Sequence, residues 1–482
     1  MESAESARLS FIDQVKALPW PFWVANIMEM IERLAYYGVR VVIPIYIAQA
    51  DEPGGLHFSQ ADKGMIFMAW ALIQSLLPVF TGGFADRYGY KKQIVIAIAL
   101  KAVGYVGMAT QREFWPFFFS CMLLAAGTAV FKPPVQGTFV KTLDERNSGV
   151  GWGFFYMVVN IGGFLGPPLA HFLYGYSWAM VFYGCAVLVS LNLLWLFTYE
   201  SPASGADTST SVLDVAWLTL KNIFQWKLLL FIGIMSFFWA GFTQLFDMMP
   251  NFIVDWVDSS AIAGSLPEFM RAADTSRGPQ IAQEWMINLN PFLIVIFVVP
   301  ISWLVNNLMR RLTSIAVGML VAGLGVALAG ATPLWSFCLL GIALFSLGEM
   351  LSSPKMSEYL GVIAPEDKKA LYMGYSNIPF AIGWTYGAFA GGDLYGRLGE
   401  KATLAMRYLG EELQVVGEIP RNEAFSMLLE KTGWSAAEAT TKLWELYSPG
   451  QVWTPFAIGI GVAVVMLVVY NRFASRWEGA NA

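Results

Sequence analysis

Charged residues, histidine and cysteine are all scarce in this chain. Only 13% of its 482 residues are charged, and it contains two histidines and three cysteines. Soluble domains usually carry about 25% charged residues, so the composition argues against a water-soluble protein. Cys121, Cys185 and Cys338 all fall within apolar stretches. They are therefore expected to be small buried residues and not a disulfide framework.

Motifs of common enzymes are missing as well. The chain has no H-E-x-x-H zinc motif, no G-x-S-x-G nucleophile motif and no cluster of histidine and cysteine. His57 falls in a loop, and His171 is a lone histidine near the end of an apolar segment, where a structural role is the usual one. We therefore expect neither an enzyme, nor a bound cofactor, nor a nucleic-acid partner.

Long apolar runs make up most of what is present, because 56% of the residues are hydrophobic. A helix that spans a membrane needs about 20 mostly apolar residues. Twelve segments meet this requirement, which predicts an all-α integral membrane protein surrounded by lipid. The segments lie near residues 20–48, 63–85, 92–110, 114–137, 150–174, 178–198, 228–256, 288–308, 313–332, 334–361, 369–392 and 453–472.

The distribution of lysine and arginine predicts the orientation. Basic residues gather in alternate loops, for example Arg87 with Lys91 and Lys141 with Arg146, whereas the opposite short loops carry few. Because basic loops stay in the cytoplasm, both termini are expected there. The polar stretch ESPASGADTSTSVLD reads as a linker. The predicted units are a six-helix bundle at 1–199, a cytoplasmic linker at 200–227 and a second six-helix bundle at 228–482, the layout of the major facilitator fold.

Two external segments interrupt the second bundle, a polar loop at 257–287 and a larger insertion at 393–452. Within the insertion, RNEAFSMLLEKTG predicts a helix that ends at Gly433, and Ser435 with Glu438 has the spacing of a capping box for the next helix. We expect a small helical lid or packing element outside the membrane. A role in binding an unknown partner or capturing substrate is the alternative, but no residue of the insertion specifically indicates it.

The first apolar segment carries an unusual charged stretch, MEMIERLAYYGVR. On a helix, most of its polar side chains share one stripe, namely Glu29, Arg33, Tyr36, Tyr37 and Arg40, with Glu32 at the edge. Ionisable groups at membrane depth are costly and usually face a partner or a wet cavity. The stripe therefore predicts a polar pore wall. A self-neutralised cluster, with Glu29 paired to Arg33, is the alternative.

This stretch resembles the E-x-x-E-R-F-x-Y-Y-G signature of the proton-dependent oligopeptide transporters, within the major facilitator superfamily; only Leu34 departs from it. Further similar motifs follow in the family's order. They are AGTAVFKPPV with Lys132, FYMVVNIGGFLGP with Asn160, NPFLIVIFVVP with Asn290, LGEMLSSP with Glu349, and Trp384 in the eleventh segment. The loop TGGFADRYGYKK fits the superfamily pattern G-x-x-x-D-R-x-G-x-K.

The resemblance implies a proton-coupled symporter of di- and tripeptides or peptide-like solutes that works by alternating access, in a bacterial cytoplasmic membrane. The residues implied to bind substrate are Arg33, Tyr37, Arg40, Lys132, Asn160, Asn290, Glu349 and Trp384. The residues implied to carry protons are Glu29, Glu32 and Glu349. The residues implied in gating are Arg40, Asp86, Arg87, Lys132 and Asp247.

An ion pair between Lys132 and Glu349 would hold one side of the protein closed, and a substrate carboxylate or a proton would break it. A permanent staple between helices is the alternative. The seventh segment departs from the family, which places an acid before the glutamine where this chain has Thr243. Asp247 lies one turn further and could replace that acid opposite Arg40.

If Asp247 does not replace it, Arg40 is free and the substrate is less certain. The first rival function is therefore the same fold transporting a non-peptide organic anion or nitrate. A membrane receptor that does not transport is a less favoured second rival.

Overall fold

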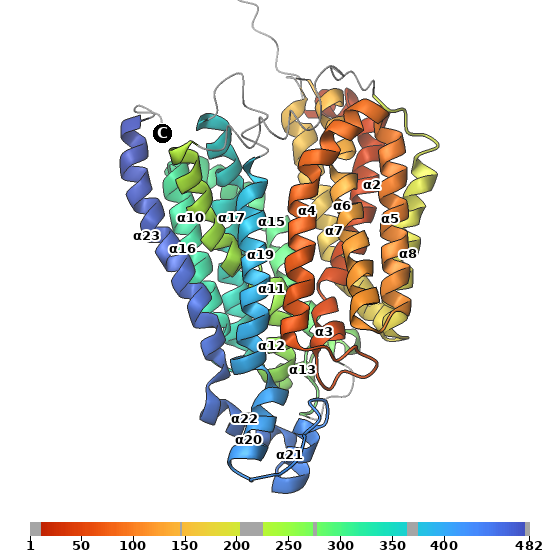
Figure 1. The fold of residues 1–482 in the computed structure, drawn as a ribbon. Helices are drawn as coiled ribbons and strands as arrows, with labels where there is room; N and C mark the ends of the chain where they lie inside the picture. Colours follow the sequence, from red (N-terminus) through yellow and green to blue (C-terminus); the bar gives the residue numbers. More distant parts are fainter. Residues whose placement is uncertain (1–10, 145–146, 203–224, 273–276, 364–374, 478–482) are drawn as a thin grey trace, which may run out of the picture.

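The chain folds into two helical bundles that stand side by side (Figure 1). The computed structural model describes residues 11–144, 147–202, 225–272, 277–363 and 375–477. The helices of the first bundle are α1 (Phe11–Lys16), α2 (Trp20–Arg40), α3 (Ile43–Ala48), α4 (Gln60–Tyr88), α5 (Tyr90–Thr110), α6 (Phe114–Thr142), α7 (Ser148–Tyr174) and α8 (Trp178–Trp195).

The second bundle contains long helices and several short ones. Its long helices are α10 (Trp226–Phe242), α15 (Leu289–Leu308), α16 (Arg311–Ala329), α17 (Trp335–Ile363), α19 (Asn377–Leu394) and α23 (Thr454–Trp477). The shorter elements are α11 (Gln244–Asp247), α12 (Met249–Trp256), α13 (Ser260–Ala263), η1 (Glu268–Met270), α14 (Gln283–Ile287), η3 (Tyr395–Gly399), α20 (Lys401–Glu411), α21 (Ala424–Thr432), α22 (Ala436–Tyr447) and η4 (Pro449–Trp453). Among the described residues, β pairing is limited to two isolated bridges.

Nine described helices are long and apolar enough to cross a membrane, by length and composition. They are 90–110, 114–142, 150–174, 178–195, 226–247, 283–305, 311–329, 335–363 and 449–474. The other three predicted segments overlap α2, α4 and α19. The start of the predicted segment 369–392 and most of the predicted linker 200–227 lie outside the described residues.

Two predicted helices are broken where the sequence analysis expected continuous ones. The segment 20–48 divides at residues 41–42 into α2 and α3, and Pro44 lies in the first turn of α3. The segment 228–256 divides into α10, α11 and α12, and Pro250 lies in the first turn of α12. Proline lacks a backbone N–H and is tolerated at the start of a helix but not inside it. As a consequence, Arg40 and Asp247 each lie at a helix end.

Glycine allows two close features of the backbone. Gly89, between α4 and α5, has φ +94°, a conformation that residues with a side chain rarely adopt. Gly64 on α4 faces α19, where an added Cβ would lie 2.8 Å from the carbonyl oxygen of Ala388 and 3.2 Å from the Cα of Gly392. The two bundles therefore touch backbone to backbone along α4 and α19.

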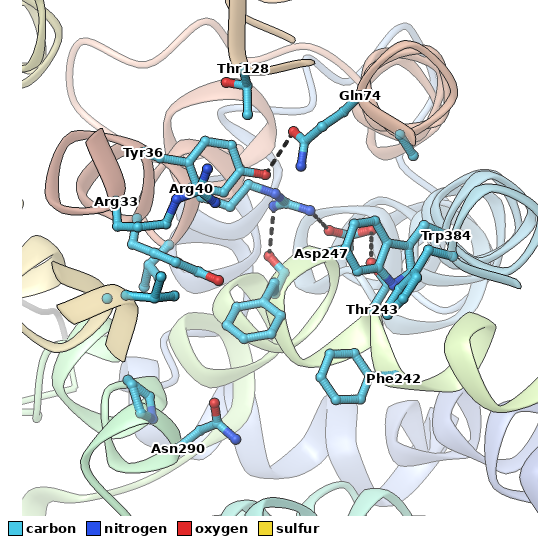
Figure 2. A pocket seen from close by; sticks show the side chains of 18 of the residues that line it. Arg33, Tyr36, Arg40, Gln74, Thr128, Phe242, Thr243, Asp247, Asn290 and Trp384 are labelled. Atoms are coloured by element: carbon cyan, nitrogen blue, oxygen red, sulfur yellow. Dashed lines mark hydrogen bonds and ion pairs between the residues drawn. The ribbon is translucent and has the colours of Figure 1, made fainter. Parts of the chain in front are cut away.

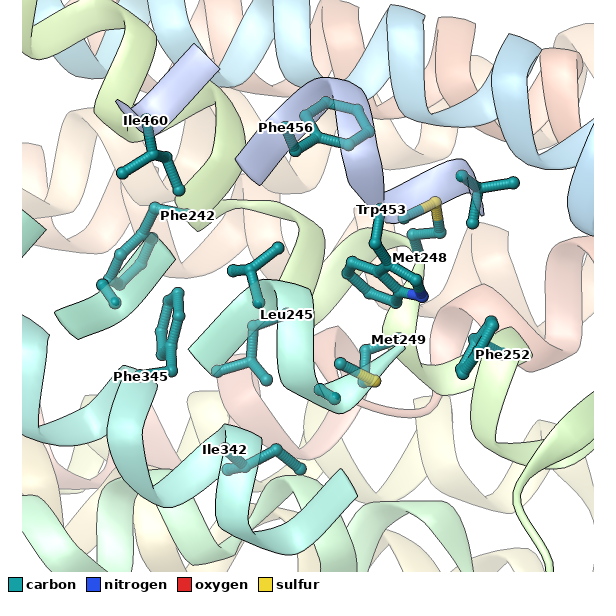
Figure 3. Packing of buried hydrophobic residues seen from close by; sticks show 14 of the residues in the cluster. Phe242, Leu245, Met248, Met249, Phe252, Ile342, Phe345, Trp453, Phe456 and Ile460 are labelled. Atoms are coloured by element: carbon teal, nitrogen blue, oxygen red, sulfur yellow. The ribbon is translucent and has the colours of Figure 1, made fainter. Parts of the chain in front are cut away.

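The second bundle and the helices α20–α22 share one hydrophobic core. Leu404, Leu428 and Leu443 belong to the same buried cluster as Phe242 and Trp453, and Figure 3 shows Phe242 and Trp453 among the packed side chains of that cluster. The indole Nε1 of Trp256 also donates to the carbonyl oxygen of Gly399 at 2.6 Å. The segment 393–452 is thus packed as part of the second bundle.

The local predictions for this segment are confirmed. Helix α21 ends before Gly433, which has the left-handed φ of +72°. Ser435 and Glu438 form a capping box at the start of α22, with the Ser435 hydroxyl 2.8 Å from the Glu438 carboxylate. Helices α20–α22 lie at the same end of the molecule as α3, α12 and α13 (Figure 1). The position of the segment 393–452 outside the membrane stays a prediction.

Candidate functional site

A cavity of about 320 Å³ lies between the two bundles. This volume is at the lower end of the range of small-ligand pockets, about 300–1,000 Å³. All eight residues that the sequence analysis assigned to substrate binding line it: Arg33, Tyr37, Arg40, Lys132, Asn160, Asn290, Glu349 and Trp384. The cavity therefore collects polar groups from both halves of the chain.

One end of the cavity is closed by an ion pair between the bundles. The guanidinium of Arg40 pairs with the carboxylate of Asp247 (Figure 2). It also donates to the carbonyl oxygen of Phe246 at 3.3 Å. The hydroxyl of Thr243 donates to the other oxygen of Asp247 at 2.9 Å. Asp247 thus occupies the position opposite Arg40 that was expected from its placement one turn after the position of the family's acid.

The two acids of α2, Glu29 and Glu32, are neutralised by neighbouring bases next to the cavity. The Nε atom of Arg33 lies 3.1 Å from Glu29 and 2.6 Å from Glu32. The second oxygen of Glu32 pairs with the ammonium group of Lys101 on α5. Glu29 and Glu32 are buried, with side-chain exposures of 6% and 1%. The ion pair of Glu29 with Arg33 is therefore part of a larger cluster.

Lys101 was not identified from the sequence. Its side chain is 1% exposed, and its ammonium group lies 4.6 Å from the centre of the Phe131 ring. A signal was available, because a lysine in the middle of the predicted span 92–110 needs a partner. The sequence does not say which neighbouring helix supplies that partner.

Lys132 and Glu349 do not form the ion pair that was expected. Lys132, on α6, is exposed to the cavity, and the described part of the chain contains no ion pair that includes it. Glu349, on α17, accepts a hydrogen bond from the amide of Asn290 at 2.9 Å, and the same amide donates to Ser346 at 3.0 Å. The two charged groups face one cavity from opposite bundles.

The bundles are joined at the end of the molecule that carries α3, α12 and α20–α22. Lys63 donates to Asn251 at 2.7 Å, and Gln49 donates to Asp255 at 2.8 Å. Further contacts across the same boundary are Gln60 to Glu400 at 3.0 Å, Gln283 to the carbonyl of Val41 at 3.2 Å, and His171 with Glu284. Closure at this end explains why Lys132 and Glu349 can stay apart.

Arg421 strengthens this joint from the segment 393–452. It pairs with Glu400 of its own bundle, with Nε 2.9 Å from the carboxylate. It also donates to main-chain carbonyl oxygens of the first bundle, those of Phe58 at 3.1 Å, His57 at 3.2 Å and Ala48. One side chain of the second bundle therefore binds three peptide groups of the first.

Three polar atoms of lining residues have no hydrogen-bond or ion-pair partner in the described part of the chain: Nε1 of Trp384, Oγ1 of Thr128 and Oδ1 of Asn288; a fourth, Nε of Arg33, has ion-pair partners only. A buried donor left without an acceptor costs about 1–3 kcal/mol, so a ligand with acceptor oxygens would be favoured here. Trp70, Trp239, Phe242 and other aromatic residues supply the apolar part of the wall.

The segment 81–92, which was predicted to be a loop, is helical except at Gly89: Asp86 and Arg87 lie in the last turn of α4, and α5 begins at Tyr90. Arg87 is exposed, and Gly89 provides the turn. The side chain of Asp86 lies outside the described set, so the predicted latch in this segment stays a prediction. His171 contacts Glu284 of the other bundle, and His57 contacts the carbonyl oxygen of Glu52 at 2.7 Å.

Comparison with known proteins supports the fold. Residues 26–256 match the Major Facilitator Superfamily model. The multidrug resistance protein MdtH of Klebsiella pneumoniae subsp. pneumoniae is 24% identical over 388 residues, which cover 80% of this chain and 89% of that protein. The protein of the same name from Salmonella newport is 25% identical over 366 residues, 75% and 84% of the two chains.

Solved structures give a second line of similarity. A peptide transporter POT in complex with sulfate has a TM-score of 0.68 at 18% identity, over 97% of this chain and 96% of that one. A POT family transporter in complex with 5-aminolevulinic acid has a TM-score of 0.63 at 15% identity, over 91% and 99%. At these identities the likeness shows the fold alone. These similarities identify the chain as a multi-pass integral membrane transporter of a small molecule and not an enzyme, and the match to the Major Facilitator Superfamily model covers residues 26–256, just under half of the chain.

Proposed function

We propose that this protein is a proton-coupled symporter of di- and tripeptides or peptide-like solutes, acting by alternating access in a bacterial cytoplasmic membrane. The observation that carries the proposal is that Lys132 and Glu349 face one cavity from opposite bundles without pairing with each other. A zwitterionic peptide needs one cationic and one anionic contact. Lys132 receives its carboxylate, and Glu349 with Asn290 receives its amino group.

The neighbouring groups fit the middle of a peptide. The unpartnered donors of Trp384 and Thr128 suit its carbonyl oxygens, and the aromatic wall suits its side chains. Arg40 is engaged by Asp247, so it acts as a gate in this conformation. The candidate proton carriers are Glu349 and one or both acids of α2, Glu29 and Glu32. The joined end lies opposite the C-terminal end of α23 (Figure 1), so with the termini in the cytoplasm it faces the outside and the cavity opens toward the cytoplasm.

A second candidate is the export of lipophilic cations. The curated relatives are called multidrug resistance proteins, and the cavity combines aromatic residues with the acid Glu349. In this function Glu349 binds the cation and Lys132 has no role in binding. The two candidates therefore differ in whether the ligand must carry a carboxylate.

Transport into proteoliposomes tests the proposal. Labelled dialanine should accumulate when the outside is acidic relative to the lumen, and only equilibrate when no proton gradient is imposed. Equal uptake in both conditions would remove proton coupling. Accumulation of tetraphenylphosphonium without uptake of the dipeptide would favour the second candidate.

A thermal-shift panel with matched variants identifies the contacts. A bound ligand raises the Tm by mass action, so dialanine, its amidated form, nitrate and tetraphenylphosphonium can be compared directly. Glu349→Gln should remove the shift given by the dipeptide, whereas Glu445→Gln, an exposed site on α22, should preserve it. A shift with nitrate alone would point to anion transport.

A further inference from the structure

Lys101 is a buried cation that the proposed transport cycle does not yet use. It lies on α5, which contributes none of the residues that line the cavity. Its ammonium group nevertheless reaches Glu32 on α2. Both side chains are 1% exposed, so water from the cavity does not reach either of them.

The fold makes room for this lysine. Gly127 on α6 lies against its aliphatic stem, where an added Cβ would approach the Cγ of Lys101 to 2.6 Å. The ring of Phe131, one turn further along α6, lies 4.6 Å from the ammonium group. A glycine beside the stem and an aromatic face beside the charge indicate a position built for lysine.

Counting charges shows what Lys101 does to its neighbours. Glu29 and Glu32 are two acids, and Arg33 and Lys101 are two bases, so the four groups are neutral together. Without Lys101, the cluster would carry one uncompensated negative charge and would attract Lys132 from the cavity wall. With Lys101, Lys132 remains available to an anionic ligand.

The two acids of α2 are therefore not equivalent. Glu32 is held between Arg33 and Lys101, whereas Glu29 has only Arg33 as an ion-pair partner in the described chain. Glu29 is also the more exposed of the two. The other ionisable groups whose charges act around Glu32 are Tyr36 and Tyr37 of α2, Tyr105 of α5, Lys132 of α6 and, next to Tyr105, Cys185 of α8.

We propose that Lys101 is a positioning residue: it fixes Glu32 as a permanent counter-ion and leaves Glu29 as the acid of α2 that exchanges a proton with the cavity. This inference rests on the proposed proton-coupled function. A substrate carboxylate at Lys132 and a proton on Glu29 favour each other, because each offsets the charge of the other. The ion pair of Lys101 with Glu32 keeps the second acid out of this exchange.

A double-mutant cycle tests the pairing without any substrate. Lys101→Met leaves a buried carboxylate short of one partner, and we expect the Tm in detergent to fall by on the order of 10 °C. Glu32→Gln together with Lys101→Met should restore most of that loss. Lys92→Met, at an exposed lysine of the same helix, should leave the Tm unchanged. A double variant no more stable than Lys101→Met would overturn the pairing.

Transport then separates the roles of the two acids. In proteoliposomes, the double variant should still accumulate dialanine under a proton gradient, to within about threefold of the unmodified protein. Glu29→Gln should lose at least 90% of that accumulation but retain exchange of dialanine across the membrane without a gradient. A double variant that exchanges dialanine but does not accumulate it would identify Glu32 as the proton carrier and refute the proposal.

Failure of the proposed function gives a different result. If the unmodified protein neither exchanges nor accumulates dialanine, peptide transport is wrong, and the assignment of Glu29 falls with it. The stability cycle still decides whether Lys101 neutralises Glu32. The two failures are therefore distinguishable.

Discussion

The two bundles use charge in different ways. The first bundle buries a neutral cluster of acids and bases in its interior, around Glu32 and Lys101. Lys132 is outside this cluster and faces the cavity. The second bundle is packed around a continuous apolar core that extends into α20–α22. Its buried charges that contact the first bundle, such as Asp247 and Asp255, lie at the boundary between the two. Changes at the cavity-facing charge of the first bundle should therefore alter ligand binding, and changes at the boundary charges and in α20–α22 of the second bundle should alter conformation and stability.

Removing the charge of Lys132, the cation of the first bundle that faces the cavity, should have the largest effect, which is on ligand affinity. We expect Lys132→Gln to weaken binding of dialanine about 100-fold, since loss of a charge-assisted hydrogen bond costs roughly 2–3 kcal/mol. Isothermal titration measures the change, and Lys141→Gln, on the same helix but outside the cavity lining, serves as the control. Equal affinity in the two variants would contradict the assigned role of Lys132.

Removing a boundary charge of the second bundle should change conformation and not ligand recognition. Arg421→Ala removes hydrogen bonds to three carbonyl groups of the first bundle. Because each hydrogen bond to a charged group contributes about 1.5–3 kcal/mol, we expect the population with the joined end open to rise at least tenfold. Spin labels at the exposed positions Pro53 and Glu430 report this opening as a second, longer distance.

The labelling design has built-in controls. The three native cysteines are buried, so engineered cysteines can be labelled selectively. Arg407→Ala removes an exposed ion pair with Glu411 inside α20 and crosses no boundary. It should leave the distance distribution as it is, and an identical distribution for Arg421→Ala would remove the role of Arg421 in closure.

A loop acid of the first bundle predicts a pH effect of moderate size. Burial raises the pKa of Glu52 to about 7, although Tyr174 and Trp178 donate to its carboxylate. The folded protein then keeps a proton that the unfolded chain has already released, so stability from this group falls as pH rises from about 4.5 to 7. We expect a loss on the order of 1–2 kcal/mol, after allowance for solvent.

Glu52→Gln should remove this pH dependence, because the amide oxygen can accept the same two hydrogen bonds and carries no charge. The measurement is the Tm of the purified protein between pH 5 and pH 7.5, compared with that of the unmodified chain. Parallel curves for the two proteins would show that Glu52 does not titrate in this range.

The smallest effect is expected far from the cavity, in the packed segment of the second bundle. Ser435→Ala removes the capping hydroxyl of α22 and should cost about 1 kcal/mol. Hydrogen exchange should become faster in the first turn of α22, with transport unchanged. Ser435→Thr keeps the oxygen and should behave like the unmodified protein; a transport defect in Ser435→Ala would blur the distinction between the two bundles.

Much of the cavity could be predicted from the sequence because a charge at membrane depth is itself informative. The stripe on α2, Lys132 and Glu349 all stand out against apolar surroundings, and all the residues assigned to substrate binding line one cavity. The capping box at Ser435 follows from local spacing alone. The breaks after Arg40 and before Pro250 carry proline signals that periodic apolarity conceals.

What could not be predicted depends on three-dimensional neighbours and on the conformational state. The pairing of Lys101 with Glu32 joins two helices whose relative rotation the sequence does not specify. The separation of Lys132 from Glu349 depends on which end of the molecule is closed, and one sequence encodes every state of a transport cycle. Arg421 lies between short helices and reaches carbonyl groups more than 350 positions away, with no motif to announce it.

The bonds of Arg421 to the first bundle end on peptide oxygens, and every residue has such an oxygen. Exchanging the side chains of residues 48, 57 and 58 leaves these acceptors in place as long as the loop keeps its path. Substitutions can therefore change the strength of this contact only on the side of the second bundle, at Arg421 or at Glu400, whose carboxylate orients Arg421. The sequence of the first bundle around residues 48, 57 and 58 can therefore vary, while the strength of the contact depends on residues of the second bundle.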